Sequence, residues 1–229
     1  TLEVKNFAQI EHAKIEFGDL TVLVGPQATG KSLLLQWFKF AIDRSEIVRA
    51  LSEAGHDVRE RASLLDLTFG EGMSKGWRSD TQIRFNNREI HLGERVRAPK
   101  DQGGGKVFFI PAHRALLLSE GWPQSFQRLN LDTPVVARLF SQNLYQRFSG
   151  RKDKSLFPVP RILKAQYRDL IDDAIFHGGE VQLEKESLRY SIRLVFDDET
   201  RLPFMAWTSG QREFAPLLLG LYQVLPGSQ

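Results

Sequence analysis

The sequence of 229 residues contains no cysteine, and none of its apolar runs approaches the roughly 18–20 residues that a membrane span requires. The missing thiols exclude a disulfide framework and thiolate metal sites. The short apolar runs, and a beginning that does not resemble a signal peptide, predict a cytoplasmic protein with no membrane partner. Histidine is scarce and lacks the spacing of zinc ligands, so no zinc site is expected. The five histidines are His12, His56, His91, His113 and His177.

A strong excess of one charge is also missing. The formal net charge of +3 permits contact with nucleic acid without arguing for it. The content of 41% hydrophobic and 26% charged residues is ordinary for a globular protein, and the length suits one domain with or without an inserted lobe. The chain starts at Thr1 without an initiator methionine and ends at Gln229, just after a predicted helix, so we expect a fragment, a processed chain or, equally, an engineered start.

The sequence does contain one phosphate-binding motif. Residues 25–32 read G-x-x-x-x-G-K-S, the P-loop pattern in which glycines let several backbone N–H groups face one anion. Lys31 would neutralise the β- and γ-phosphates of ATP, and the Ser32 hydroxyl would bind Mg²⁺. ATP and Mg²⁺ are therefore the predicted cofactors. The predicted nucleotide-binding residues are Gly25, Pro26, Gln27, Ala28, Thr29, Gly30, Lys31 and Ser32.

The segments on either side of the motif support this interpretation. Residues 20–24 read Leu-Thr-Val-Leu-Val, an apolar and β-branched run that is typical of a buried strand. Residues 32–42 place apolar side chains at helical spacing and contain no helix breaker. A strand, a P-loop and a helix are therefore predicted in that order.

The remaining pattern predicts an α/β protein. Two N-terminal strands, 2–7 and 12–17, form an antiparallel pair, and Asn86-Asn87 predicts a hairpin within 81–92. Further strands are predicted at 106–110, 181–183, 188–196 and 201–205, and a helix at 161–176. We predict a single P-loop NTPase domain over 1–229, with N-terminal antiparallel strands, a mixed central sheet and an inserted helical lobe at 115–176.

A second motif, Thr208-Ser209-Gly210-Gln211, precedes an apolar helix that starts near Phe214. Thr208 is placed to cap this helix, and Gln211 stands three residues later in the capping-box position. Small residues at a free helix N-terminus also form an anion site. The motif therefore predicts a helix start with a capacity to bind anions.

Acidic residues after the strand 194–196 allow two interpretations. Asp197, Asp198 and Glu199 follow apolar residues, as in the Walker B strand that holds magnesium. The alternation of that strand indicates a half-exposed position, and the acids suit a turn before Arg201. We favour the turn and leave open a two-motif P-loop NTPase that uses Asp197 or Asp198.

Three features together resemble the ABC-type ATPase heads of the SMC and OLD-nuclease superfamily. They are most similar to the prokaryotic AAA ATP-binding proteins of anti-phage defence, such as the Septu and retron-linked ATPases. The features are the strand 2–7 that leads into the P-loop, the segment 108–114 and the segment 208–213. The resemblance implies that Thr208, Ser209, Gly210 and Gln211 form an ABC signature, which acts with Lys31 in catalysis when two heads sandwich two ATP molecules head to tail.

The same resemblance sets limits on catalysis by this chain. The segment after Ile110 falls where the family has its Q-loop, although no glutamine stands at Ala112 or His113. Walker B, its catalytic glutamate and the switch histidine would follow the signature helix, beyond the last residue of this sequence. The resemblance therefore implies a chain that binds ATP but hydrolyses it poorly by itself.

Three function hypotheses follow. The first is an ATPase head that forms a homodimer on ATP and controls an effector nuclease or a nucleic-acid transaction. The second is a nucleotide-binding regulatory or scaffold module without efficient turnover. The third is the two-motif NTPase described above.

Overall fold

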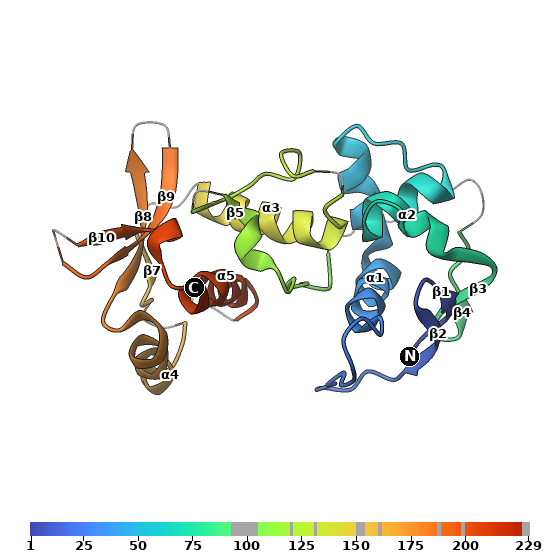
Figure 1. Cartoon of the computed structure of the whole chain (residues 1–229), viewed down its shortest axis with the longest axis horizontal. Helices are drawn as coiled ribbons and strands as arrows, with labels where there is room; N and C mark the ends of the chain where they lie inside the picture. Colours follow the sequence, from blue (N-terminus) through green and yellow to red (C-terminus); the bar gives the residue numbers. More distant parts are fainter. Residues whose placement is uncertain are drawn as a thin grey trace. The chain divides into compact units, whose positions relative to one another are not determined.

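The computed structural model describes residues 1–92, 105–119, 121–130, 132–149, 154–159, 162–186, 189–197 and 200–225. These residues form both helices and strands, which confirms the predicted α/β class (Figure 1). The chain separates into two compact units. Unit 1 comprises Thr1–Phe109 with Leu129–Val136, and unit 2 comprises Ile110–Arg128 with Ala137–Gln229. Most of the lobe predicted at 115–176 belongs to unit 2, together with the strands and the helix that follow it.

The sheet of unit 1 is antiparallel and has the order β2-β1-β3-β4. Its strands are β1 (Leu2–Phe7), β2 (Ile10–Ile15), β3 (Trp77–Phe85) and β4 (Arg88–Glu89). The predicted N-terminal pair is confirmed, since Val4 pairs with Ala13, although its second strand lies two residues earlier than predicted. The predicted hairpin is also confirmed. Asn86 and Asn87 have φ of 48° and 64°, the left-handed values that a two-residue hairpin turn requires. Its second strand ends at Glu89, earlier than predicted.

An aromatic cluster packs the helices of unit 1 on this sheet. The helices are α1 (Lys31–Glu53), α2 (Arg61–Phe69) and the short 3₁₀ helix η1 (Met73–Gly76). Trp37 of α1 is fully buried, and its ring centroid lies 5.1 Å from that of Phe7 on β1 and 4.5 Å from that of Phe69 on α2. Burial of such large rings is a major stabilising term, so this cluster fixes the position of α1 on the sheet.

Unit 2 contains a second antiparallel sheet, of order β10-β9-β8-β7. The strands predicted at 188–196 and 201–205 are confirmed with small changes of length, and the strand predicted at 181–183 is longer than predicted. The helix predicted at 161–176 starts later and ends in a π-helical turn. Residue 161 lies outside the described residues. The elements that follow unit 1 along the chain are η2 (Arg114–Leu117), β5 (Leu118–Ser119), β6 (Trp122–Pro123), α3 (Val135–Ser149), β7 (Ser155–Phe157), α4 (Ala165–Ile171), η3 (Asp172–Phe176), β8 (Glu180–Glu186), β9 (Arg189–Val195), β10 (Arg201–Pro203), η4 (Phe204–Ala206) and α5 (Ser209–Val224).

Phe176 connects helix and sheet within unit 2. It is fully buried at the end of η3, with its ring centroid 5.1 Å from Phe157 on β7 and 6.3 Å from Phe214 on α5. The first turns of α5, which carry the second motif, are therefore held against the core of this unit.

The mixed central sheet is not observed, because all strand pairs among the described residues are antiparallel. The predicted strand 20–24 is not formed, and Leu20, Val22 and Val24 are 85%, 71% and 86% exposed. A strand needs a neighbour, and the sheet of unit 1 pairs β1 with β2 and β3 without including this segment. The predicted strand 106–110 is not formed either, because a side chain of α1 binds its backbone, as described below.

Candidate functional site

The P-loop motif lies at the start of α1, as the sequence predicts, and its backbone has three left-handed positions. Gly25, Ala28 and Gly30 have φ of 149°, 61° and 90°. At Gly30 a side chain is also excluded by space, since a Cβ would lie 2.6 Å from Cγ1 of Ile10, a buried residue of β2. The glycine at position 30 therefore lets the loop pass close to the first hairpin before α1 begins.

The side chain of Lys31 donates hydrogen bonds to several residues of the loop. Its Nζ donates hydrogen bonds to the carbonyl oxygen of Gly25 at 2.8 Å, to that of Pro26, and to Oγ1 of Thr29 at 3.4 Å. The hydroxyl of Thr29 also donates to the carbonyl oxygen of Pro26, at 3.0 Å. The ammonium group thus sits among the oxygens of residues 25–29, at the centre of the segment predicted to surround phosphate.

The N-terminus of α1 is suited to an anion. Gly30 is its N-cap and provides no side-chain hydrogen bond, and the first turn contains no acidic residue. Backbone N–H groups of a first helical turn have no partner within the helix, and the helix dipole adds positive potential there. Lys31 supplies a full positive charge at the same place, and Ser32 is exposed beside it. These groups together form a site that attracts phosphate.

The second motif starts a helix, and its predicted capping box is confirmed. Gln211 N donates to the hydroxyl of Thr208 at 3.3 Å, and Thr208 N donates to the side-chain oxygen of Gln211 at 3.1 Å. The side-chain nitrogen of Gln211 donates to the carbonyl oxygen of Ile175 at 2.8 Å, so this amide is used within unit 2. Ser209 and Gly210 are exposed at the first turn of α5.

Arg114 has a role that the sequence does not reveal. Its Nε donates to the carbonyl oxygen of Glu213 on α5 at 2.8 Å, and its second nitrogen lies 3.2 Å from the carbonyl oxygen of Ala112. Arg114 therefore ties the segment after the predicted Q-loop position to the helix of the second motif. His113, its neighbour, is exposed.

The turn interpretation of Asp197 is confirmed. Its carboxylate accepts a hydrogen bond from Thr200 N at 2.5 Å, and Arg201 pairs with Val195 in the β9–β10 hairpin. Asp198 lies outside the described residues. The P-loop belongs to unit 1, whereas Asp197 and Thr208–Gln211 belong to unit 2.

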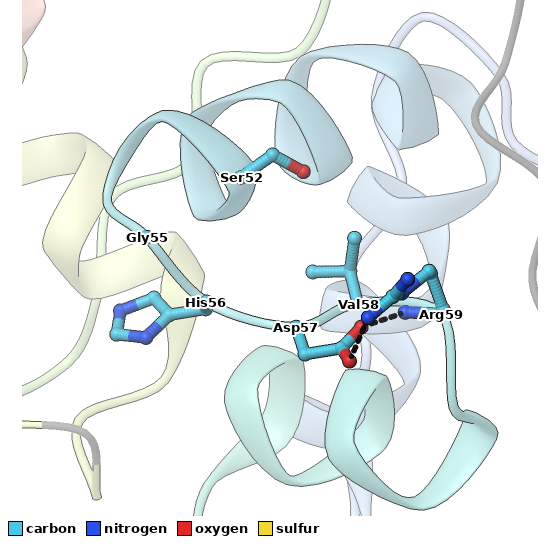
Figure 2. Close-up of a pocket in the computed structure, with 6 residues that line it drawn as sticks. All are labelled: Ser52, Gly55, His56, Asp57, Val58 and Arg59. Carbon is cyan, nitrogen blue, oxygen red and sulfur yellow. Dashed lines mark hydrogen bonds and ion pairs between the residues drawn. The ribbon is translucent and has the colours of Figure 1, made fainter.

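A shallow pocket of about 360 Å³ lies at the end of α1 (Figure 2). Its charged lining residues are Asp57 and Arg59, whose side chains form an ion pair at 2.8 Å. The hydrogen bonds from Arg59 lower the pKa of Asp57 to about 2. Because the two charges neutralise each other, we assign no reaction to this pocket.

Mg²⁺ in such sites usually takes ligands from substrate phosphates and keeps several waters, so Ser32 is its predicted protein ligand only when nucleotide is bound. Within the described ranges, no three His, Asp or Glu side chains form a group that could hold a metal ion. No helix in the same ranges is both long and apolar enough to cross a membrane. Comparisons of the chain with protein-family models, with curated proteins and with solved structures gave no match.

Proposed function

We propose that this protein binds ATP with Mg²⁺ through residues 25–32. The observation that carries the proposal is the position of Lys31, whose ammonium lies among the loop carbonyls at the N-terminus of α1. A positive charge, a helix N-terminus and a glycine-bent loop in one place constitute the chemistry that phosphate requires.

Each residue has a separate task in this proposal. Lys31 would exchange its carbonyl partners for phosphate oxygens, with which a charged hydrogen bond is stronger. The backbone of residues 26–29 would form the wall around the phosphates. The exposed hydroxyl of Ser32 would be the protein ligand of Mg²⁺, which would neutralise charge on the phosphates.

We further propose that ATP brings two copies together head to tail, and that the α5 N-terminus of one copy faces the nucleotide of the other. Ser209 and Gly210 are exposed and their helix N-terminus is positive, which suits a contact with the γ-phosphate in trans. By the family resemblance, such an ATP hydrolase would control an effector nuclease or a nucleic-acid transaction.

Calorimetry of ATP binding in the presence of Mg²⁺ tests the first proposal. Lys31→Ala removes the central charge and is expected to abolish measurable binding. Lys14→Ala, an exposed lysine on β2, is the matched control and is expected to bind like the wild type. Equal affinity of the Lys31→Ala variant and the wild type would refute the assignment.

Sedimentation velocity with and without ATP tests the dimer. Ser209→Arg places a bulky side chain at the exposed first turn of α5, so it is expected to block the ATP-dependent dimer while the monomer still binds ATP. Gln166→Arg adds the same group at an exposed position of α4 in the same unit and should dimerise normally. An unaltered ATP-dependent dimer of the Ser209→Arg variant would refute the proposed role of this motif in dimerisation.

The alternative function is a nucleotide-binding module without efficient turnover. It is favoured by the position of Asp197, because this candidate Walker B acid binds the backbone of its own turn. Steady-state release of phosphate separates the two functions. Turnover of about 1 s⁻¹ or faster, ordinary for enzymes, would reject the alternative.

A further inference from the structure

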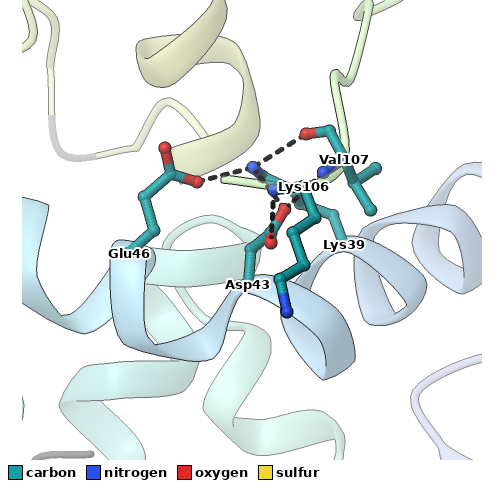
Figure 3. Close-up of polar contacts among 5 residues, drawn as sticks. All are labelled: Lys39, Asp43, Glu46, Lys106 and Val107. Atoms are coloured by element: carbon teal, nitrogen blue, oxygen red, sulfur yellow. Dashed lines mark hydrogen bonds and ion pairs between the residues drawn. The ribbon is translucent and has the colours of Figure 1, made fainter. Parts of the chain in front are cut away.

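A buried cluster of charges lies on α1 beyond the P-loop (Figure 3). Lys39 and Asp43 are each only 4% exposed, and their side chains form an ion pair at 2.9 Å. Lys39 also donates to Glu46 at 2.7 Å and to the carbonyl oxygen of Val107 at 2.9 Å. An ammonium group has three donors, so this arrangement gives each of them an acceptor.

The carboxylate of Asp43 binds the backbone of the segment that was predicted to be a strand. Its two oxygens accept hydrogen bonds from Lys106 N at 2.7 Å and Val107 N at 2.8 Å. Together with the hydrogen bond from Lys39 to Val107, side chains of α1 therefore provide the hydrogen-bond partners that a neighbouring strand would otherwise give to this backbone. This explains why residues 106 and 107, the start of the predicted strand 106–110, lie beside α1 without pairing to a strand.

The same residue interrupts the helix. Asp43 has φ of −114° and ψ of 29°, so α1 consists of two helical parts that meet at the clamp. We use the name clamp for Lys39, Asp43 and Glu46 with the backbone of residues 105–107. Helix kinks have local causes, and here a side chain at the kink is engaged by another segment of the chain.

Gly105 completes the fit. A Cβ at this position would clash with both carboxylate oxygens of Glu46. An alanine at position 105 would force the Glu46 carboxylate or the segment 105–107 to move, so position 105 offers a way to disturb the clamp without changing α1 itself.

We propose that the clamp positions the P-loop helix for nucleotide, a regulation of the site that rests on the proposed ATP binding. The first part of α1 carries Lys31 and Ser32 at one end and the clamp at the other, with eight residues from Lys31 to Lys39, a rise of about 12 Å along the helix axis. Holding the far end fixes the helix before ATP arrives, so less conformational freedom is lost on binding. By reciprocity, bound ATP stabilises the clamp.

Two variants disturb the clamp from opposite sides. Asp43→Asn removes the charge that accepts both backbone N–H groups, and Gly105→Ala places a methyl group where the Glu46 carboxylate lies, so the contact between Glu46 and the segment 105–107 is disturbed. Glu53→Gln removes the exposed ion pair of Arg49 and Glu53 on the same helix and serves as the control. The measurements on the full chain are calorimetry with ATP and Mg²⁺, and hydrogen exchange of the Lys106 and Val107 amides with and without ATP.

In the wild type and in Glu53→Gln, ATP is expected to slow exchange of both amides. The two clamp variants are expected to lose this response and to bind ATP at least about five-fold more weakly, the lower end of typical coupling between sites. A role limited to structure would lower the unfolding temperature and leave ATP affinity unchanged in the folded variants, which would overturn the proposal. If Asp43→Asn does not fold, the ATP affinity and the amide exchange of the Gly105→Ala variant test the proposal.

Wild-type exchange that is the same with and without saturating ATP would also overturn the proposal, whatever the variants do. A wild type that does not bind ATP refutes the proposed function itself. A wild type and clamp variants that bind ATP equally refute only the clamp, so the two failures are distinguishable.

Discussion

Gly30→Ala gives the sharpest test of how the P-loop is built. Two separate costs fall on this position. Its φ of 90° costs an L-residue about 1–2 kcal/mol, and the added Cβ would lie 2.6 Å from Cγ1 of Ile10. Ile10 is only 5% exposed, so its side chain has little room to retreat, and overpacking of this kind costs about 1–3 kcal/mol. The sum is about 2–5 kcal/mol.

Two other glycines separate these costs. Gly55 has φ of 85° and no atom within 4 Å of an added Cβ, so Gly55→Ala contributes the backbone cost alone. Gly18 has open space as well and no left-handed φ, so Gly18→Ala is expected to lie within about 0.5 kcal/mol of the wild type. The difference in the free energy of unfolding between Gly30→Ala and Gly55→Ala therefore measures the packing of the loop on β2.

The assay is equilibrium unfolding in urea, with the free energy of unfolding compared at constant slope. We expect Gly30→Ala to be the least stable of the three, by about 1–3 kcal/mol relative to Gly55→Ala. If Gly30→Ala and Gly55→Ala were equally stable, the close approach of the loop to Ile10 would be refuted, and with it the packed state of the P-loop.

Three further predictions concern single side chains. Because Val22 is 71% exposed, Val22→Ala is expected to leave the free energy of unfolding within about 0.5 kcal/mol of the wild type in the same urea titration. Val4→Ala, at a fully buried position, should cost about 2 kcal/mol. Equal costs would mean that residues 20–24 are buried. Thr208→Ala is expected to cost about 0.5–2 kcal/mol through loss of the α5 cap, and Thr208→Ser to restore most of it, by thermal unfolding. By NMR, the pKa of the Asp57 carboxyl is expected to be about 2 in the wild type and to return towards 3.8 in Arg59→Ala. Since the folded-state pKa is lowered, the contribution of this ion pair to stability is full above the ordinary pKa of Asp57 and is lost as the pH falls through about 2. An unchanged pKa in Arg59→Ala would contradict the ion pair.

Local sequence signals predicted the elements that depend on neighbours in the chain. Asn86 and Asn87 adopt left-handed conformations at little cost, so their hairpin forms wherever two alternating strands flank them. The capping box of Thr208 and Gln211 is complete within four residues. The start of α1 after Gly30 follows for the same reason.

Signals that depend on a distant partner gave wrong predictions. The composition of residues 20–24 is that of a buried strand, but composition does not state which strand lies beside it, and the sheet of unit 1 does not include this segment. The segment 106–110 also has the composition of a strand, yet Asp43, 63 residues before Lys106, binds its backbone instead. Lys39, Asp43 and Glu46 share one face of a predicted helix at i, i+4 and i+7 spacing, which was the available signal for the clamp.

Residues 25–32 alone predict where a phosphate-binding loop could form and which helix carries it, because the glycines, Lys31 and the helix start lie within eight residues. Residues 208–211 likewise predict the cap and the first turn of α5. Three features come from tertiary packing: Lys31 lies among the loop carbonyls, Gly30 packs against Ile10, and α1 is held at Asp43 by residues far along the chain. Such contacts depend on how distant segments meet as the core packs, which no local pattern specifies.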